Sequence, residues 1–298
     1  MTSRLRFALL ATGGLALSGC VVAVGNEGTS ATIPPVPVAP GNPPSTMQWL
    51  YGSGEAGAAS IQIYHAFRDH VLAAAKSRPR DSVVLAEGAT LASPRFVPCG
   101  NKPFAVMLDV DETALLNIGY EYDEALSGRS YDPEVWAAWE RTGAQAVSPV
   151  PGAVTALRAL RAVNVTVMFN SNRKAANAAG TEAALQAAGL GPARHGETLF
   201  LSGDDDQGSA KDGRRSRVAA RYCVLALAGD QLGDFSDLFN ARALSVPGRR
   251  DAVTGGTFAN LWGNGWFILP NPVYGPGLRG NFDDVFPADK RWSPQGAQ

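Results

Sequence analysis

The sequence predicts an α/β fold in which a parallel sheet is covered by helices on both faces. Short apolar segments, typical of buried strands, alternate along the chain with longer segments of helical periodicity. Acidic or hydroxyl side chains come directly or closely after three of these apolar segments. Because ligands bind beyond the carboxyl ends of parallel strands, we expect these side chains to meet in one crevice.

The apolar patterns predict the following helices and strands. A helix is expected first, over 60–76, because apolar residues recur there at three- and four-residue steps. Strands are predicted over 104–108, 163–169, 198–201, 222–228 and 266–269, and the helices between them over 153–161, 175–188 and 210–221. Residues 115–150 form an insert after the first of these strands, and we expect the insert to shape a small lid over the crevice.

The N-terminal residues predict export. Arg4 and Arg6 precede an apolar stretch that is too short to cross a bilayer, which is typical of a signal peptide. Cys20 ends a segment that resembles the bacterial lipobox, and this resemblance implies removal of residues 1–19 and acylation of the cysteine. An ordinary cleaved signal peptide with a chance cysteine is the alternative.

The residues after the lipobox predict a tether followed by a domain. The segment 20–45, which starts at the lipidated Cys20, is rich in proline and shows little periodicity, as expected of an extended linker. The globular domain is expected over 46–298. Val21 rather than an aspartate follows the cysteine, and by resemblance to Gram-negative lipoproteins this favours the outer membrane.

The charge balance excludes a general attraction to polyanions. The 298 residues carry 26 Lys and Arg against 27 Asp and Glu, a net charge of −1, and removal of residues 1–19 would leave 24 against 27, or −3. We therefore expect no nucleic-acid partner. An anionic substrate must be attracted by a local site.

Two cysteines remain beyond the lipobox. Cys99 and Cys223 each lie just upstream of a predicted strand, so they could face each other at one end of the sheet. Export would let a disulfide persist. The sequence does not give the Cα separation that a bridge requires, so a disulfide and two free thiols both remain open.

The first candidate for chemistry is the pair Asp109 and Asp111, which follows the strand predicted over 104–108. On an extended loop, two carboxylates two residues apart can point to the same side. One can attack phosphorus as a nucleophile, and the other can donate a proton to the leaving oxygen and later activate water. The alternative is an Asx turn at the end of a strand.

Two further elements suit the binding of phosphate. Ser171 can donate a hydrogen bond to a phosphoryl oxygen, although it could equally cap the helix that follows. Lys211 can neutralise the nucleophile and the phosphate together, although a lone surface lysine is the alternative. Nearby Arg214, Arg215 and Arg217 are expected on a solvated face, where one of them could support Lys211.

Asp230 and Asp234 suggest a metal site after the strand predicted over 222–228. Mg²⁺ prefers hard oxygen ligands, usually one or two carboxylates and several waters. Asp230 can reach the ion directly, and Asp234 is expected to hold its waters. The ion would offset the repulsion between an anionic nucleophile and an anionic phosphate.

Taken together, these motifs resemble those of the class C acid phosphatases, the bacterial lipoprotein e-like group of the haloacid dehalogenase superfamily. The resemblance rests on residues 109–113, 171–173 and 229–235 and extends from about 49 to 274. It implies a Rossmannoid fold with extra N-terminal helices. It also implies a Mg²⁺-dependent acid phosphatase that forms an aspartyl phosphate, with nucleoside 5′-monophosphates and aryl phosphates as the expected substrates.

The resemblance assigns a role to each matching residue. It implies that Asp109 is the nucleophile and a metal ligand, and that Asp111 is the general acid and base with a main-chain contact to the metal. It implies phosphate binding by Ser171 and Lys211. It also implies that Asp230 binds the metal and that Asp234 holds waters at the metal. Trp136 and Tyr274 stand where the family clamps an aromatic leaving group, and core packing is the alternative. Asn170 and the segment 210–215 depart from the family pattern, which affects the expected substrate preference more than the reaction class.

Other interpretations are less well supported. Residues 52–57 fit G-x-G-x-x-G but do not follow a predicted strand, so we do not expect a dinucleotide site. A phosphotransferase on the same scaffold and a non-catalytic binding lipoprotein are the functional alternatives. The expected partners are a small phosphomonoester and a membrane reached through Cys20, and a homodimer is left open. Catalysis is expected at mildly acidic pH if Asp111 must be protonated.

Overall fold

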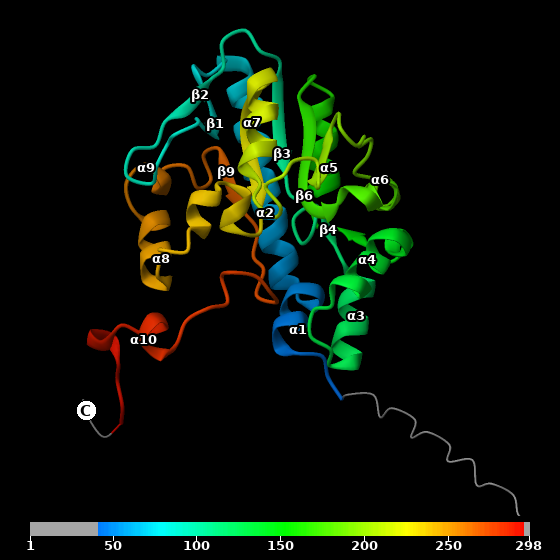
Figure 1. The fold of residues 1–298 in the computed structure, drawn as a ribbon, viewed down its shortest axis with the longest axis vertical. Helices are drawn as coiled ribbons and strands as arrows, with labels where there is room; N and C mark the ends of the chain where they lie inside the picture. The colour runs from blue at the N-terminus through cyan, green and yellow to red at the C-terminus, as the bar shows by residue number, and fades with distance from the viewer. Residues whose placement is uncertain (1–40, 295–298) are drawn as a thin grey trace, which may run out of the picture. The chain divides into compact units, whose positions relative to one another are not determined.

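A five-stranded parallel sheet forms the centre of the computed structural model, which describes residues 41–294 (Figure 1). Its strands are β3 (Phe104–Leu108), β6 (Thr166–Lys174), β7 (Leu199–Ser202), β8 (Cys223–Gly229) and β9 (Trp266–Ile268). They lie in the order β7-β6-β3-β8-β9, and every neighbouring pair is parallel. The predicted α/β class is confirmed.

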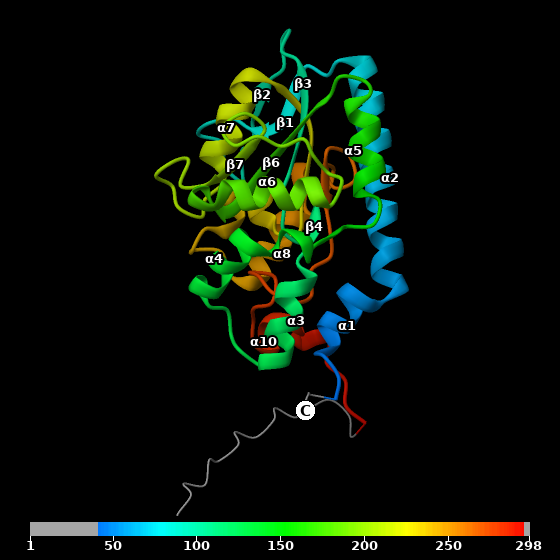
Figure 2. The same ribbon diagram turned by 90° about the vertical axis from the view of Figure 1, so that its right-hand side faces the viewer.

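Helices cover both faces of this sheet. The first face packs against α2 (Gly54–Ser77), α5 (Ala153–Arg161) and α6 (Ala178–Ala187), and the second against α7 (Asp212–Arg221) and a hairpin of β1 (Asp81–Leu85) and β2 (Phe96–Pro98). Figure 2 shows α2 and α5 on one side of the strands and α7 with the hairpin on the other.

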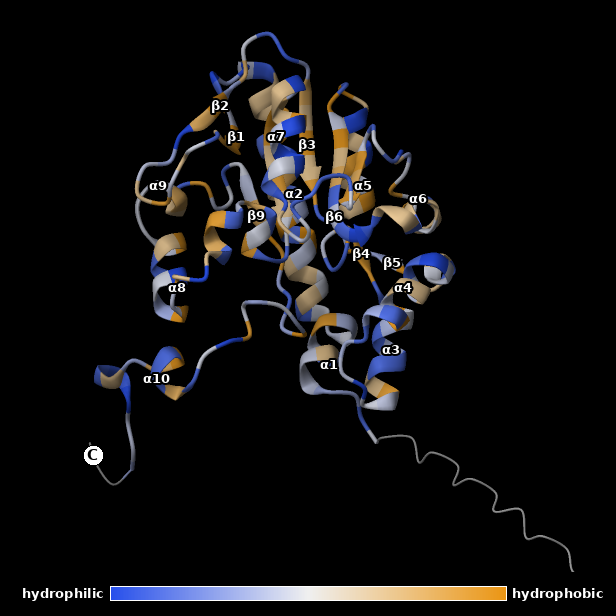
Figure 3. Cartoon of the chain, in the orientation of Figure 1, coloured by the Kyte–Doolittle hydropathy of each residue, from blue (hydrophilic) through white to orange (hydrophobic). Residues whose placement is uncertain are grey.

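The alternation of side chains along β3 explains the two cores. Val106 and Leu108 join the core under α2 and α5, whereas Ala105 and Met107 join the core under α7. Successive residues of a strand point to opposite faces, so a strand buried on both sides must be apolar throughout. Figure 3 shows the resulting concentration of apolar residues along the central strands.

The predicted insert forms a small helical unit between β3 and α5. It contains β4 (Leu115–Leu116), α3 (Ile118–Ser127), α4 (Pro133–Thr142) and β5 (Ser148–Pro149). The antiparallel pairing of β4 with β5 closes its base. Helix α4 begins after Asp132, whose carboxylate accepts a hydrogen bond from the backbone N–H of Glu134 at 2.8 Å.

The remaining elements lie near the two ends of the described chain. They are α1 (Ser45–Gly52), α8 (Val246–Thr254), α9 (Gly256–Ala259) and α10 (Phe282–Val285). Within residues 41–294, no helix is both long and apolar enough to cross a membrane. The signal peptide over 1–19 and the acylation of Cys20 fall outside the described residues and stay predictions.

Two features of the sheet differ from the sequence prediction. Strand β6 continues to Lys174, five residues beyond its predicted end, because it resumes pairing with β7 at Ser202 after an irregularity in register. Ser171 therefore lies within a strand. The β1–β2 hairpin, which forms a separate two-stranded sheet, was not predicted.

The cysteine alternatives are resolved in favour of a disulfide. Cys99 follows β2 and Cys223 begins β8, and the two are bonded with their Cα atoms 4.6 Å apart. Both are fully buried. The bridge therefore ties the hairpin to the amino end of β8, the end opposite to Asp230.

Candidate active site

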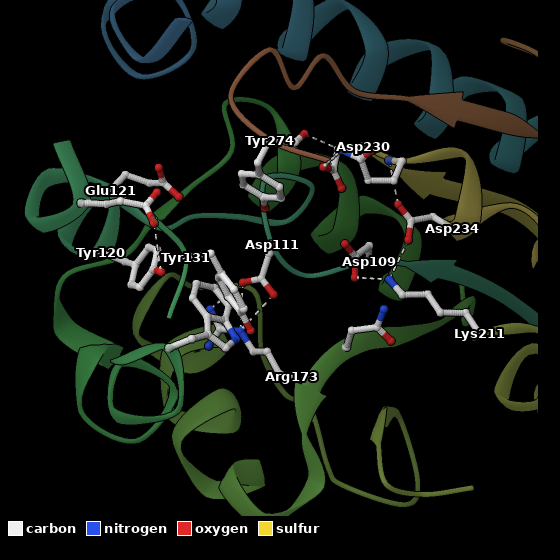
Figure 4. A pocket seen from close by; sticks show the side chains of 14 residues that line it. Asp109, Asp111, Tyr120, Glu121, Tyr131, Arg173, Lys211, Asp230, Asp234 and Tyr274 are labelled. Atoms are coloured by element: carbon white, nitrogen blue, oxygen red, sulfur yellow. Dashed lines mark hydrogen bonds and ion pairs between the residues drawn. The ribbon is translucent and has the colours of Figure 1, made fainter. Parts of the chain in front are cut away.

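Three of the predicted carboxylates meet where β3 and β8 end (Figure 4). Asp109 follows β3 directly, and Asp230 follows β8 directly. The adjacent strands are held in register there, since the Asp109 N–H donates to the carbonyl oxygen of Ala228 at 2.9 Å. With Asp234, these residues bring three carboxylate oxygens within 4.8 Å of one another, all of them buried. We call Asp109, Asp230 and Asp234 the aspartate trio.

Lys211 is the cation that faces the trio. Its Nζ donates to Asp109 Oδ1 and to Asp234 Oδ1, each at 2.6 Å, and the side chain is 6% exposed. The residue stands at the start of α7, where its own backbone N–H donates to Asp237 Oδ2 at 2.9 Å. Its position between two carboxylates orients the side chain of Asp109.

The loop after β8 requires a glycine. Asp234 folds back so that its Oδ2 accepts a hydrogen bond from the Gln231 N–H at 2.9 Å. A β-carbon placed on Gly229 would lie 2.2 Å from the β-carbon of Asp234, a separation that real structures do not show. Asp230 is fixed separately, because Asn271 Nδ2 donates to it at 2.8 Å and Thr113 Oγ1 at 3.2 Å.

The carboxylate of Asp111 is held apart from the trio. Arg173 donates to its Oδ1 from Nη2 at 2.7 Å and from Nε at 2.9 Å, and Asn117 Nδ2 donates to the same oxygen at 2.9 Å. The Ser171 hydroxyl donates to Oδ2 at 3.4 Å. A guanidinium that donates two hydrogen bonds to a carboxylate fixes the orientation of the carboxylate as well as its position.

The electrostatics of the trio favour a bound cation. Burial raises the pKa of Asp109 well above its usual value; Lys211 opposes the shift, and the charges of Asp234 and Asp230 add to it. Burial and the charge of Asp234 raise the pKa of Asp230 to about 7. Lys211 neutralises only part of the charge of these three buried carboxylates, whose ligand atoms are all hard oxygens. These residues fit a hard divalent cation, which would relieve the repulsion.

A pocket of about 330 Å³ opens in front of these groups. Trp136 and Tyr274, the predicted aromatic pair, both line it. Trp136 packs its ring against the edge of Tyr120 with centroids 4.8 Å apart, and the hydroxyl of Tyr274 donates to Glu112. Ser171, in contrast, is fully buried and does not line the pocket, where its neighbours Asn172 and Arg173 appear instead. Its contact with phosphate stays a prediction.

Several polar residues around the site were not identified from the sequence. Arg173 was part of a recognised motif, but its ion pair with Asp111 joins residues 62 positions apart and leaves no local signal. Asn117 and Glu112 are also fully buried beside Asp111. The amide of Asn117 donates to both carboxylates, which fixes the loop that follows Asp111.

The expectation of a solvated arginine face on α7 was wrong for two of its three members. Arg214 and Arg215 are 0% and 1% exposed, and only Arg217 is on the surface. Arg214 donates to the carbonyl oxygen of Ser171 at 2.5 Å, and Arg215 donates to that of Asp234 at 3.0 Å. Because both guanidinium groups are buried under the site, they satisfy main-chain carbonyls instead of meeting water.

Comparison with known proteins places this arrangement in a family. The family model described as HAD superfamily, subfamily IIIB (acid phosphatase), matches residues 63–277. The class C acid phosphatase from Bacillus anthracis is 26% identical, with a TM-score of 0.62 over 78% of this chain and 85% of that chain. A structure of the class C acid phosphatase from Bacillus anthracis with tungstate bound has 24% identity and a TM-score of 0.64 over 84% of this chain and 96% of that one, which supports the fold. The chain belongs to subfamily IIIB of the haloacid dehalogenase superfamily, the class C acid phosphatases, and is a phosphoric monoester hydrolase.

Proposed function

We propose that this phosphatase depends on Mg²⁺ and acts through an aspartyl phosphate on Asp109. The proposal rests on one observation: at the same pocket, the carboxylate of Asp109 lies in the trio and that of Asp111 is held apart from it. Asp109 lies in the trio beside Lys211, where a cation and a phosphate can be gathered. Asp111 is held away from the trio by Arg173, where it can exchange a proton.

The proposed reaction has two steps. An oxygen of Asp109 bonds to phosphorus while the ester P–O bond breaks, and the leaving oxygen takes a proton from Asp111. Water then attacks the phosphorus of the acyl phosphate and gives its proton to Asp111, so that inorganic phosphate leaves and Asp109 is regenerated. The divalent cation, when bound by Asp109, Asp230 and the main chain of Asp111, supplies the charge that offsets anionic repulsion.

The residues around the reacting groups support roles for the chain itself. Lys211 orients Asp109 and adds a positive charge toward the phosphate, and Asp234 holds Lys211 and faces the cation. Ser171 supports Asp111 and the phosphate end of the pocket. Because Asp111 must be protonated in the first step, we expect the highest rate at mildly acidic pH.

The pocket suits a phosphomonoester with a planar leaving group. The rings of Trp136 and Tyr274 line a cavity of about 330 Å³, in which one planar group can pack against aromatic side chains. We therefore propose nucleoside 5′-monophosphates and aryl phosphates as substrates.

The direct test measures phosphate release from a panel of nucleotides and 4-nitrophenyl phosphate. Wild type should hydrolyse the panel with Mg²⁺, lose activity in EDTA and regain it when Mg²⁺ is restored. Asp109→Asn should lower kcat by about 10⁴-fold or more, because it removes the nucleophile. The exposed-loop variant Asp206→Asn is the matched control. If neither EDTA nor Asp109→Asn lowered activity, the proposed mechanism would be wrong.

We further propose that the protein is an outer-membrane lipoprotein anchored through Cys20. The lipobox-like sequence and the proline-rich segment after it support this location. Fractionation of cells that express the full chain should place it in the outer membrane, and Cys20→Ala should release it from there. Equal membrane retention of both proteins would contradict the anchor.

A further inference from the structure

The pocket has a second end, opposite the aspartate trio. Tyr120, Glu121 and Glu124 line it from α3, and Tyr131 lines it from the loop before α4. We call these four residues the glutamate end. Figure 4 shows Glu121 across the pocket from Asp109 and Lys211, with Asp111 and Tyr274 between them. A substrate whose phosphate lies at the trio therefore directs its leaving group toward these glutamates.

Glu121 is a buried carboxylate that lacks a partner. It is 4% exposed, and its Oε2 has no hydrogen-bond partner within residues 41–294. Its neighbour Glu124 differs, because it is half-buried and interacts with the hydroxyl of Tyr120 at 3.3 Å. Burying an ionised group without a partner is costly, so a side chain of this kind at a pocket wall indicates a ligand group of complementary character.

The charges that line the pocket specify that character. The lining has six carboxylates, namely Asp109, Asp111, Glu121, Glu124, Asp230 and Asp234, and two cations, Arg173 and Lys211. Both cations are engaged elsewhere, Arg173 with Asp111 and Lys211 with the trio. A divalent ion and a phosphate dianion cancel each other, so they leave the surplus negative charge in place.

The surroundings of Glu121 disfavour its ionised form unless a cation lies beside it. Burial raises the pKa of Glu121 to about 8, and the charges of Glu112 and Glu124 add to the shift. The same end of the pocket presents the aromatic rings of Tyr120, Tyr131 and Trp136. Aromatic faces attract cations, and more strongly when the cation has lost part of its water. A positively charged group is therefore favoured there by both kinds of neighbour.

We propose that the glutamate end binds an ammonium group carried by the leaving group of the substrate, with Glu121 as the residue that determines this specificity. The preferred substrates then include aminoalkyl phosphomonoesters. The inference rests on the proposed function only in requiring that the pocket hydrolyse phosphomonoesters. Glu121 contacts the substrate and takes no part in the bond-breaking steps.

The test compares two substrates that differ in one group. O-phosphoethanolamine and 2-hydroxyethyl phosphate have the same length, but the first ends in an ammonium and the second in a hydroxyl. Phosphate release in the presence of Mg²⁺ gives kcat/KM for each. We expect wild type to prefer the ammonium substrate about tenfold or more, and Glu121→Gln to lower this ratio about tenfold, as for loss of one partly desolvated charge interaction.

The matched control is Glu134→Gln on α4, which makes the same charge change at an exposed position outside the pocket. The ratio of kcat/KM for the two substrates should be the same in this variant as in wild type. If wild type showed no preference for the ammonium substrate, the inference would be overturned, whether or not Glu121→Gln folds. It would also be overturned if Glu121→Gln left the ratio of the two kcat/KM values unchanged. Failure of wild type to release phosphate from either substrate and from 4-nitrophenyl phosphate would instead overturn the proposed function.

Discussion

The two ends of the pocket are built from different parts of the chain. The aspartate trio comes from the loops that directly follow β3 and β8, so the parallel pairing of two central strands fixes its geometry. The glutamate end comes from the insert, whose helices α3 and α4 are joined by an exposed segment and lie outside the sheet. On the proposals above, the aspartate trio performs the common reaction and the glutamate end selects the leaving group.

The two ends also differ in how their charges are balanced. In the trio, Lys211 pairs with two carboxylates, and a divalent cation can complete the balance. At the glutamate end, Glu121 has no positive partner within the described chain. Changes at the trio should therefore affect every substrate alike, and changes in the insert should affect substrates selectively.

Among the changes that compare the two ends, Lys211→Met should have the largest effect. The substitution removes the ammonium that lies between Asp109 and Asp234, so kcat should fall about 10²–10³-fold for alkyl, aryl and nucleoside phosphates alike. Steady-state phosphate release measures this loss of kcat. The control is Lys174→Met, which changes an exposed lysine at the end of β6. A loss of kcat for only one class of substrate would contradict the proposed difference between the two ends of the pocket.

Arg173→Gln should have a smaller effect that depends on the leaving group. Arg173 holds Asp111 in place. In the proposed mechanism Asp111 donates the proton to the leaving oxygen, so a misplaced Asp111 should matter most for poor leaving groups. We expect about a 10²-fold loss of kcat/KM for alkyl phosphates and about tenfold or less for 4-nitrophenyl phosphate. An equal loss for both substrates would show that Arg173 has a purely structural role.

The trio should make stability depend on pH when divalent cations are removed. The pKa of Asp230 is raised to about 7 from its usual 3.8, so the unfolded chain loses this proton at lower pH than the native protein does. The free energy of unfolding therefore falls as pH rises through this interval. In EDTA, Tm should be lower by about 5 °C or more at about pH 8 than at about pH 5.

Added Mg²⁺ should raise Tm most at the higher pH, because it stabilises the ionised trio. Asp230→Asn should flatten the pH dependence in EDTA, since the amide does not titrate. Differential scanning calorimetry with matched buffers measures both effects. A Tm that rises with pH in EDTA would contradict the electrostatic description of the trio.

The smallest effect expected is that of Trp136→Leu in the insert. Loss of the ring should raise KM about tenfold for aryl and nucleoside phosphates, which corresponds to about 1.4 kcal/mol of stacking. Phosphate release from 2-hydroxyethyl phosphate should change little, because that substrate has no ring. If kcat fell equally for both substrates, the insert would serve the reaction itself and the comparison would need revision.

The positions of Asp109 and Asp230 could be predicted from sequence because their signal is local, whereas Asp234 was expected only to hold waters at the metal. Asp109 and Asp230 each follow an apolar run directly, and a parallel sheet brings the carboxyl ends of its strands to one edge. The alternation of short apolar segments with helical segments predicted the α/β fold and the position of the insert. These inferences need only the order of the elements along the chain.

Features that depend on distant contacts could not be predicted in this way. Arg173 pairs with Asp111 across 62 positions, and the missed strand β1 is fixed by Trp266, whose Nε1 donates to the carbonyl oxygen of Val83 at 2.8 Å. Arg214 is buried against the main chain of Ser171, 43 positions away, which helical periodicity does not specify. Glu121 carries no sequence signal that distinguishes it from the half-buried Glu124 or the exposed Glu134 of the same insert.

The bond between Cys99 and Cys223 encloses the whole insert. The two cysteines are 124 positions apart, so Asp109, Lys211 and every residue of α3 and α4 belong to one covalently closed loop. A protease that cuts the exposed turn at Gly128 would open this loop but leave both fragments on one covalent framework. In an oxidising compartment, the tip of the insert can therefore be nicked, lengthened or exchanged while the sheet remains in one piece.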